Sequence, residues 1–74
     1  MRSKPEIEAF VRDWVAHNVH LVPELNLPAE VDRWASDLTG EARAQGISGS
    51  DLNKTVGDID DYLTSQHQQI SSAA

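Results

Sequence analysis

The segment SKPEIEAFVRDWVAHN, residues 3–18, has the clearest structural pattern in this chain of 74 residues. Ser3 is a typical N-cap, Pro5 is favoured in the first turn of a helix, and Glu6 has the spacing of a capping box. The apolar residues that follow recur at intervals of three and four, at Ile7, Phe10, Val11, Trp14 and Val15. Residues with this spacing share one face of an α-helix, so the segment predicts an amphipathic helix ending near residue 18.

A second amphipathic helix is expected from about residue 28 to residue 45. Its buried face comprises Val31, Trp34, Ala35, Leu38 and Ala42. Gly46 follows at the position where a left-handed residue commonly ends a helix. Gly40 costs about 1 kcal/mol relative to alanine inside a helix, and it would allow another helix to approach closely.

Two further helices are predicted after residue 46, and the first of them is short. The first is capped by Ser48 or Ser50, runs through residues 51–54 and is broken by Gly57. The inward-facing residues of the last helix are Val56, Ile59, Tyr62 and Leu63. Three acidic residues lie near its N-terminus, where the helix dipole favours carboxylates, namely Asp58, Asp60 and Asp61. From about residue 67 the chain is polar, so we expect a domain of residues 1–66 and a disordered tail of residues 67–74.

Residues 42–56 have the spacing of a helix-turn-helix. Ala42 is small enough for two helices to cross, Gly46 makes the turn, and Leu52 anchors the second helix. No segment shows strand alternation, so the fold class is all-α, a compact bundle of three to four helices with this element. The second helix carries one cation, Lys54, whereas major-groove readers need Arg or Lys for phosphates and guanines. DNA binding by this chain alone is therefore disfavoured.

The formal net charge is −6, which repels phosphate backbones and anionic lipid headgroups and attracts a basic protein surface. Cysteine is absent, so disulfides and thiolate metal sites are excluded, as fits a reducing cytoplasm. No run approaches the roughly 20 apolar residues that span a bilayer, and the first residues lead into no apolar run of a signal peptide. We expect a cytoplasmic protein without a membrane partner.

The candidate metal and catalytic groups are weak. His17, His20 and Glu24 could hold zinc, but surface histidines near a helix C-terminus are the simpler interpretation. Residues 51–57 superficially resemble a calcium loop, yet Gly57 stands at the seventh position where the sixth is required. The sequence has no thiol, no glycine-rich phosphate loop and no nucleophile elbow. We therefore predict no metal, no cofactor and no enzymatic activity.

The connector of residues 19–28 is more apolar than most loops. It carries Leu21, Val22, Leu25 and Leu27. Either this connector covers the helices and closes the core, or it offers an apolar patch to a partner. We expect it to close the core, because so small a domain needs its apolar side chains. Trp14 and Trp34 have the same two interpretations, and core burial is the expected one.

Two motifs resemble a family of short rhizobial proteins. They are Phe-Val-Arg-Asp-Trp-Val-Ala-His-Asn at residues 10–18 and Glu-Ala-Arg-Ala-Gln-Gly-Ile-Ser at residues 41–48, followed by Leu52 and Gly57. The resemblance covers roughly residues 7–66. That family was long known only as a domain of unknown function, is often encoded on symbiosis islands, and includes the quorum-sensing antiactivator that blocks acyl-homoserine-lactone-dependent activators of conjugative transfer. The connector at residues 20–28 is longer here than in some relatives.

The resemblance implies an antiactivator that binds and inhibits a LuxR-type transcriptional activator. In this hypothesis the carboxylates accelerate association and apolar side chains supply affinity. The candidate contact residues are Leu21, Val22, Leu25, Asp58, Asp60 and Asp61. The alternatives are a DNA-binding helix-turn-helix regulator and the antitoxin of a toxin–antitoxin pair.

Overall fold

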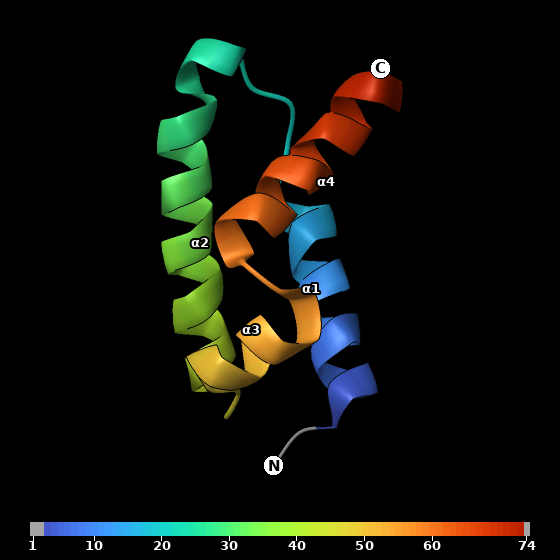
Figure 1. Cartoon of the computed structure of the whole chain (residues 1–74), viewed down its shortest axis with the longest axis vertical. Helices are drawn as coiled ribbons and strands as arrows, with labels where there is room; N and C mark the ends of the chain where they lie inside the picture. The colour runs from blue at the N-terminus through green and yellow to red at the C-terminus, as the bar shows by residue number, and fades with distance from the viewer. Residues whose placement is uncertain (1–2, 74) are drawn as a thin grey trace.

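Each predicted helix is present in the computed structural model, which describes residues 3–73 (Figure 1). The elements are α1 (Lys4–Asn18), the short 3-10 helix η1 (Glu24–Asn26), α2 (Leu27–Ala44), α3 (Gly49–Val56) and α4 (Ile59–Ala73). No strand occurs among these described residues. The fold class is therefore an all-α bundle, as the sequence predicted.

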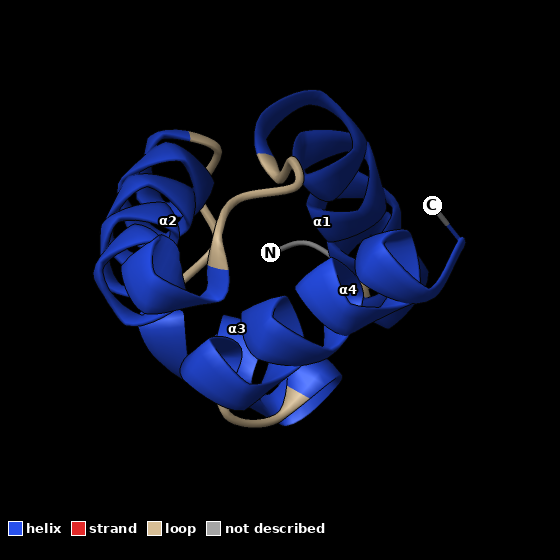
Figure 2. Cartoon of the chain, turned by 90° about the horizontal axis from the view of Figure 1, so that it is seen from above, coloured by secondary structure: helices blue, strands red, loops and turns tan. Residues whose placement is uncertain are grey.

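The helices surround a single core. In Figure 1, α2 stands on one side, α1 and α4 lie on the other, and α3 closes the lower end. Figure 2, seen from above, shows α2 across the bundle from α1 and α4. Helix α4 packs mainly on α2, and α3 packs on both α1 and α2. The buried apolar side chains are Ile7, Val11, Trp14, Val15, Val19, Val31, Trp34, Leu38, Ala42, Ile47, Leu52 and Leu63. Core burial of both tryptophans is thus confirmed.

Helix α1 begins where its capping residues require. The Ser3 hydroxyl oxygen accepts a hydrogen bond from the Glu6 backbone N–H at 3.4 Å. The same hydroxyl lies 3.3 Å from Glu6 Oε1, to which it donates. At the other end, Val19 N–H donates to the Val15 carbonyl at 2.9 Å and closes the last turn. These local bonds fix both ends of α1.

The α2–α3 turn confirms the helix-turn-helix-like element. Ala42 and Leu52 are fully buried, and Gly46 adopts φ +81°, a left-handed conformation that favours glycine. The Ile47 N–H donates to the Ala42 carbonyl at 2.8 Å, which satisfies a carbonyl at the end of α2. Of the two candidate caps for α3, it is Ser48 that accepts from a backbone N–H, that of residue 51, at 3.1 Å.

Two local expectations are wrong. A side chain at Gly40 would meet no atom within 4 Å, so no helix approaches α2 closely there. Val56 belongs to α3 and not to the last helix, because the chain turns at Gly57, which has φ +81°. Val56 is nevertheless partly buried against the core.

The expected disorder of residues 67–74 is wrong for residues 67–73, and residue 74 lies outside the described residues. Helix α4 continues to Ala73. The physical reason is that His67 and Ile70 extend the buried stripe of Leu63 at intervals of four and three. His67 is 3% exposed, so it belongs to the interior of the bundle.

Candidate protein-interaction surface

The connector divides its apolar side chains between core and surface. Leu25 is 96% exposed and Leu21 is 52% exposed, and they are the large hydrophobic side chains that the bundle leaves in solvent among the described residues. Val19 is buried, and Val22 and Leu27 are partly buried against the core. The connector therefore closes the core and presents an apolar surface, so the two interpretations apply to different residues of one segment.

The candidate residue Val22 differs from its two neighbours. Its backbone N–H donates a hydrogen bond to His67 Nε2 at 3.1 Å. The ring also lies beside Trp34, with the two ring centroids 6.3 Å apart. Val22 is thus a point where the connector is held to α4.

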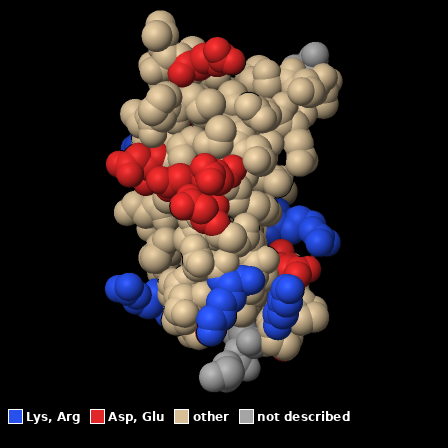
Figure 3. All heavy atoms as spheres, viewed as in Figure 1, with Lys and Arg blue, Asp and Glu red and all other residues tan. Residues whose placement is uncertain are grey.

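The three candidate aspartates are exposed at the start of α4. Asp58 has a structural task, since its Oδ1 accepts from the Asp61 N–H at 3.2 Å and so caps the helix. Asp60 and Asp61 occupy the first turn. Figure 3 shows acidic side chains gathered at mid-height over α2 and the start of α4, while basic side chains collect toward the lower end.

Of these three aspartates, Asp60 lines hollows that α4 forms with α2. Asp32 of α2 lines the same hollows, so a carboxylate from each helix borders this surface. The sequence analysis did not name Asp32. The exposed stripe of α2 could have indicated it, but only the packing of α4 turns that stripe into one wall of a groove. We call the surface formed by this seam the α2–α4 groove.

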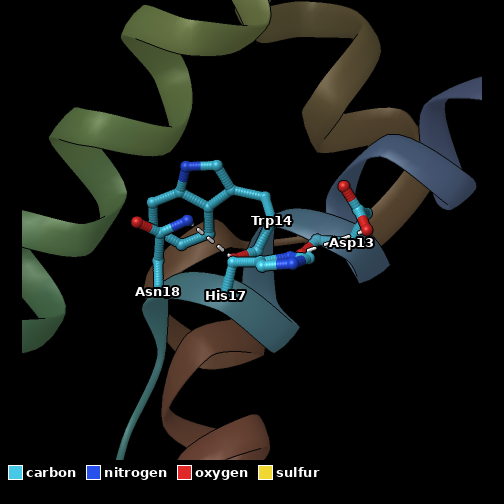
Figure 4. Close-up of polar contacts among 4 residues, drawn as sticks. All are labelled: Asp13, Trp14, His17 and Asn18. Atoms are coloured by element: carbon cyan, nitrogen blue, oxygen red, sulfur yellow. Dashed lines mark hydrogen bonds and ion pairs between the residues drawn. The ribbon is translucent and has the colours of Figure 1, made fainter.

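The two histidines near the end of α1 do not converge on a metal site. His17 Nδ1 donates to the Asp13 carbonyl at 2.8 Å, as Figure 4 shows, while Asn18 donates to the Trp14 carbonyl at 2.9 Å. The ring of His20 instead packs edge-on against Trp34, with centroids 5.8 Å apart. Within residues 3–73 no group of three His, Cys, Asp or Glu side chains could hold a metal ion.

Helix α3 would be the recognition helix in the DNA-binding alternative. It comprises GSDLNKTV, with Lys54 as its one cation and Asp51 as an opposing charge. Lys54 is exposed in the last turn, and Asp51 is half-buried in the first. Helix α3 itself therefore supplies a single cation, Lys54, for the phosphate contacts of a helix-turn-helix, while other basic side chains gather at the same lower end of the bundle (Figure 3).

The surroundings of the Tyr62 phenol shift its pKa. Burial raises the pKa of its phenol, and the nearby Arg12 guanidinium lowers it in part. Arg12 and Tyr62 line a small hollow between α1 and α4 together with Glu8. Burial therefore favours the neutral, protonated phenol in this hollow.

No family model, curated protein or solved structure matches this chain. Among the described residues, no helix has both the length and the apolar character that crossing a bilayer requires.

Proposed function

We propose that this protein is a small, non-enzymatic, cytoplasmic regulator that binds and inhibits a LuxR-type transcriptional activator. The observation that carries the proposal is Leu25, a large apolar side chain that is 96% exposed on the connector. It lies two residues before Leu27, which lines the acidic α2–α4 groove. An exposed apolar anchor beside a charged surface is the usual arrangement of a protein interface.

The charge supports an activator as the partner. A DNA-binding surface must carry Lys and Arg to neutralise phosphates, so it is basic. This chain has a formal net charge of −6 and gathers acidic side chains over α2 and α4. Such a surface is attracted to the DNA-binding face of an activator and repelled by DNA itself. The resemblance to the rhizobial antiactivator family points to the same partner class.

The test is inhibition of a purified activator. The activator, loaded with its acyl-homoserine lactone, is bound to fluorescently labelled promoter DNA, and the protein is titrated in while anisotropy is recorded. We expect the anisotropy to fall as the protein removes the activator from DNA. Unchanged anisotropy at saturating protein would refute the proposal. The protein with DNA alone is the control, and a sequence-specific shift there would support the DNA-binding alternative.

A charge variant sharpens the test. Changing Asp58, Asp60 and Asp61 to asparagine should slow association with the activator at low salt and flatten the salt dependence of the association rate. The reason is that neutral amides do not attract a basic surface as carboxylates do. Asparagine at position 58 still caps α4, so the fold is retained. Affinity capture from the native host identifies the physiological partner, and recovery of a small toxin instead would support the antitoxin alternative.

A further inference from the structure

The α2–α4 groove extends along the seam as two hollows that meet at a pair of carboxylates. The upper hollow is lined by Leu27, Pro28, Ala29, Val31, Asp32, Asp60 and Thr64. The lower hollow is lined by Asp32, Ala35, Ser36, Thr39, Gly40, Arg43, Ile59 and Asp60. Asp32 and Asp60 belong to both, one from each helix. The groove is therefore apolar at its upper end and acidic at its middle.

The α2 wall of the groove follows one face of the helix. Positions 28, 32, 36, 40 and 43 recur at intervals of four and three, so they form a continuous stripe beside the buried one. Ser36 and Gly40 are small, Arg43 ends the stripe, and a Cβ at Gly40 would meet no atom within 4 Å. The surface is therefore open at Gly40, and a helix could lie along the stripe.

The charges along this stripe have a direction. Asp32 and Asp60 provide two carboxylates at the middle, and Arg43 provides a cation at the lower end. Asp32 and Arg43 are 11 positions apart along α2 (43 minus 32). At 1.5 Å per residue this corresponds to about 16 Å along the groove. A helix lying in the groove would meet opposite charges at both points if its own basic and acidic residues had the same separation.

We propose that the α2–α4 groove binds one amphipathic helix of the partner, with a basic residue between Asp32 and Asp60 and its apolar face on Leu27 and Val31. The proposal rests on the proposed function in requiring a protein partner. It differs from that function in assigning the contact to the groove and its occupant to a helix with a Lys or Arg. Apolar residues of such a helix at intervals of three and four would follow the groove.

The probe is a fluorescein-labelled helical peptide as long as α2, 18 residues, with leucines on one face and with a lysine and a glutamate 11 positions apart. A peptide of the same composition, scrambled so that the leucines share no face, is the control. We expect the designed peptide, but not the scrambled peptide, to bind the protein at low salt. In amide NMR spectra of the protein, the shifted signals should be those of groove residues. Binding by both peptides alike, or shifts confined to α1 and α3, would overturn the proposal.

A steric variant separates binding from folding. Gly40→Leu places a side chain into open groove space and replaces glycine in a helix interior, so thermal stability should be maintained or raised. Affinity for the peptide should fall about tenfold or more, because the side chain occupies the site of the incoming helix. The matched control is Ala16→Leu at an exposed position of α1, which should leave affinity unchanged. Undiminished binding by Gly40→Leu would refute the groove.

A charge variant tests the identity of the occupant. Asp32→Asn with Asp60→Asn should weaken peptide binding about three- to tenfold at low salt, since two exposed charge pairs are lost. Asp13→Asn with Asp37→Asn changes the net charge equally away from the groove and should have little effect. Equal losses in both double variants would show a general attraction to negative charge and overturn the assigned contact.

Two further outcomes are decisive. If the activator is inhibited by wild type and by Gly40→Leu alike, the groove proposal fails while the proposed function stands. If the peptide binds in the groove but the activator stays on DNA, the groove proposal stands and the proposed function fails. Sedimentation that shows a dimer of wild type and a monomer of Gly40→Leu would assign the groove to a second copy of this chain and overturn the proposal.

Discussion

Replacing His67 with leucine is expected to destabilise the bundle by about 1–2 kcal/mol. The imidazole Nε2 accepts the Val22 N–H at 3.1 Å, and the ring is 3% exposed. Leucine fills a similar volume but offers no acceptor. A donor left unsatisfied in a buried position costs about 1–3 kcal/mol. The Val22–His67 bond is part-buried, and the additional apolar surface of leucine offsets part of that cost.

The assay is unfolding by heat and by urea, followed by circular dichroism of the helices. For a domain of 60–100 residues, 1 kcal/mol lowers the midpoint by roughly 4–8 °C, so we expect a decrease of about 4–16 °C for His67→Leu. His67→Gln should recover part of the loss, because its amide oxygen can accept at a comparable reach. Gln68→Leu, at the neighbouring exposed position, should stay within about 0.5 kcal/mol of wild type.

The reasoning would be refuted by two results together. If His67→Leu unfolds at the wild-type midpoint and His67→Gln unfolds no later than His67→Leu, then the bond to Val22 does not contribute to stability. A comparable loss in Gln68→Leu would instead show that α4 tolerates no leucine in this region, and the effect could not be attributed to the acceptor.

Three other perturbations have defined outcomes. Tyr62 should titrate above pH 10.0, because burial raises its pKa, and its contribution to stability should be lost as the pH rises through that raised value. The absorbance of this single tyrosine measures the titration, and Arg12→Gln should raise the pKa further. Titration at or below pH 10.0 would contradict the argument. Gly57→Ala should cost about 1–3 kcal/mol in urea unfolding, because φ +81° with ψ −151° is a backbone conformation that essentially only glycine adopts. Gly40→Ala should instead add up to about 1 kcal/mol, and equal effects would exclude backbone strain as the cause. Leu25→Ser should leave the midpoint within about 0.5 kcal/mol and weaken activator capture, and full capture would remove Leu25 from the interface.

The sequence was sufficient where structure is set locally. Helix α1 ends at Asn18 as expected, and α2 begins and ends within one residue of the prediction, because caps and apolar spacing act within a few positions. The helix-turn-helix-like element was predictable for the same reason, since Gly46 and the buried Leu52 have characteristic positions. These features depend little on the rest of the bundle.

The sequence was insufficient where burial depends on the path of the whole chain. In the connector, Val19 is buried and Leu25 is 96% exposed, and no periodicity distinguishes apolar residues of an irregular segment. His67 has the spacing of a core residue relative to Leu63, but its polarity led to the prediction of a tail. Asp32 became part of a groove only because α4 crosses α2 at that point.

The bond between Val22 and His67 has a consequence for the order of folding. It joins positions 45 residues apart and so connects the α1–α2 connector with the C-terminal half of α4. Helices α1 and α2 can form from local contacts, but the Val22 N–H reaches its acceptor in the His67 ring only when α4 has docked. The connector and the end of α4 should therefore open together as one cooperative unit. In native-state hydrogen exchange, the amide of Val22 should follow those of α4 and not those of the neighbouring α1.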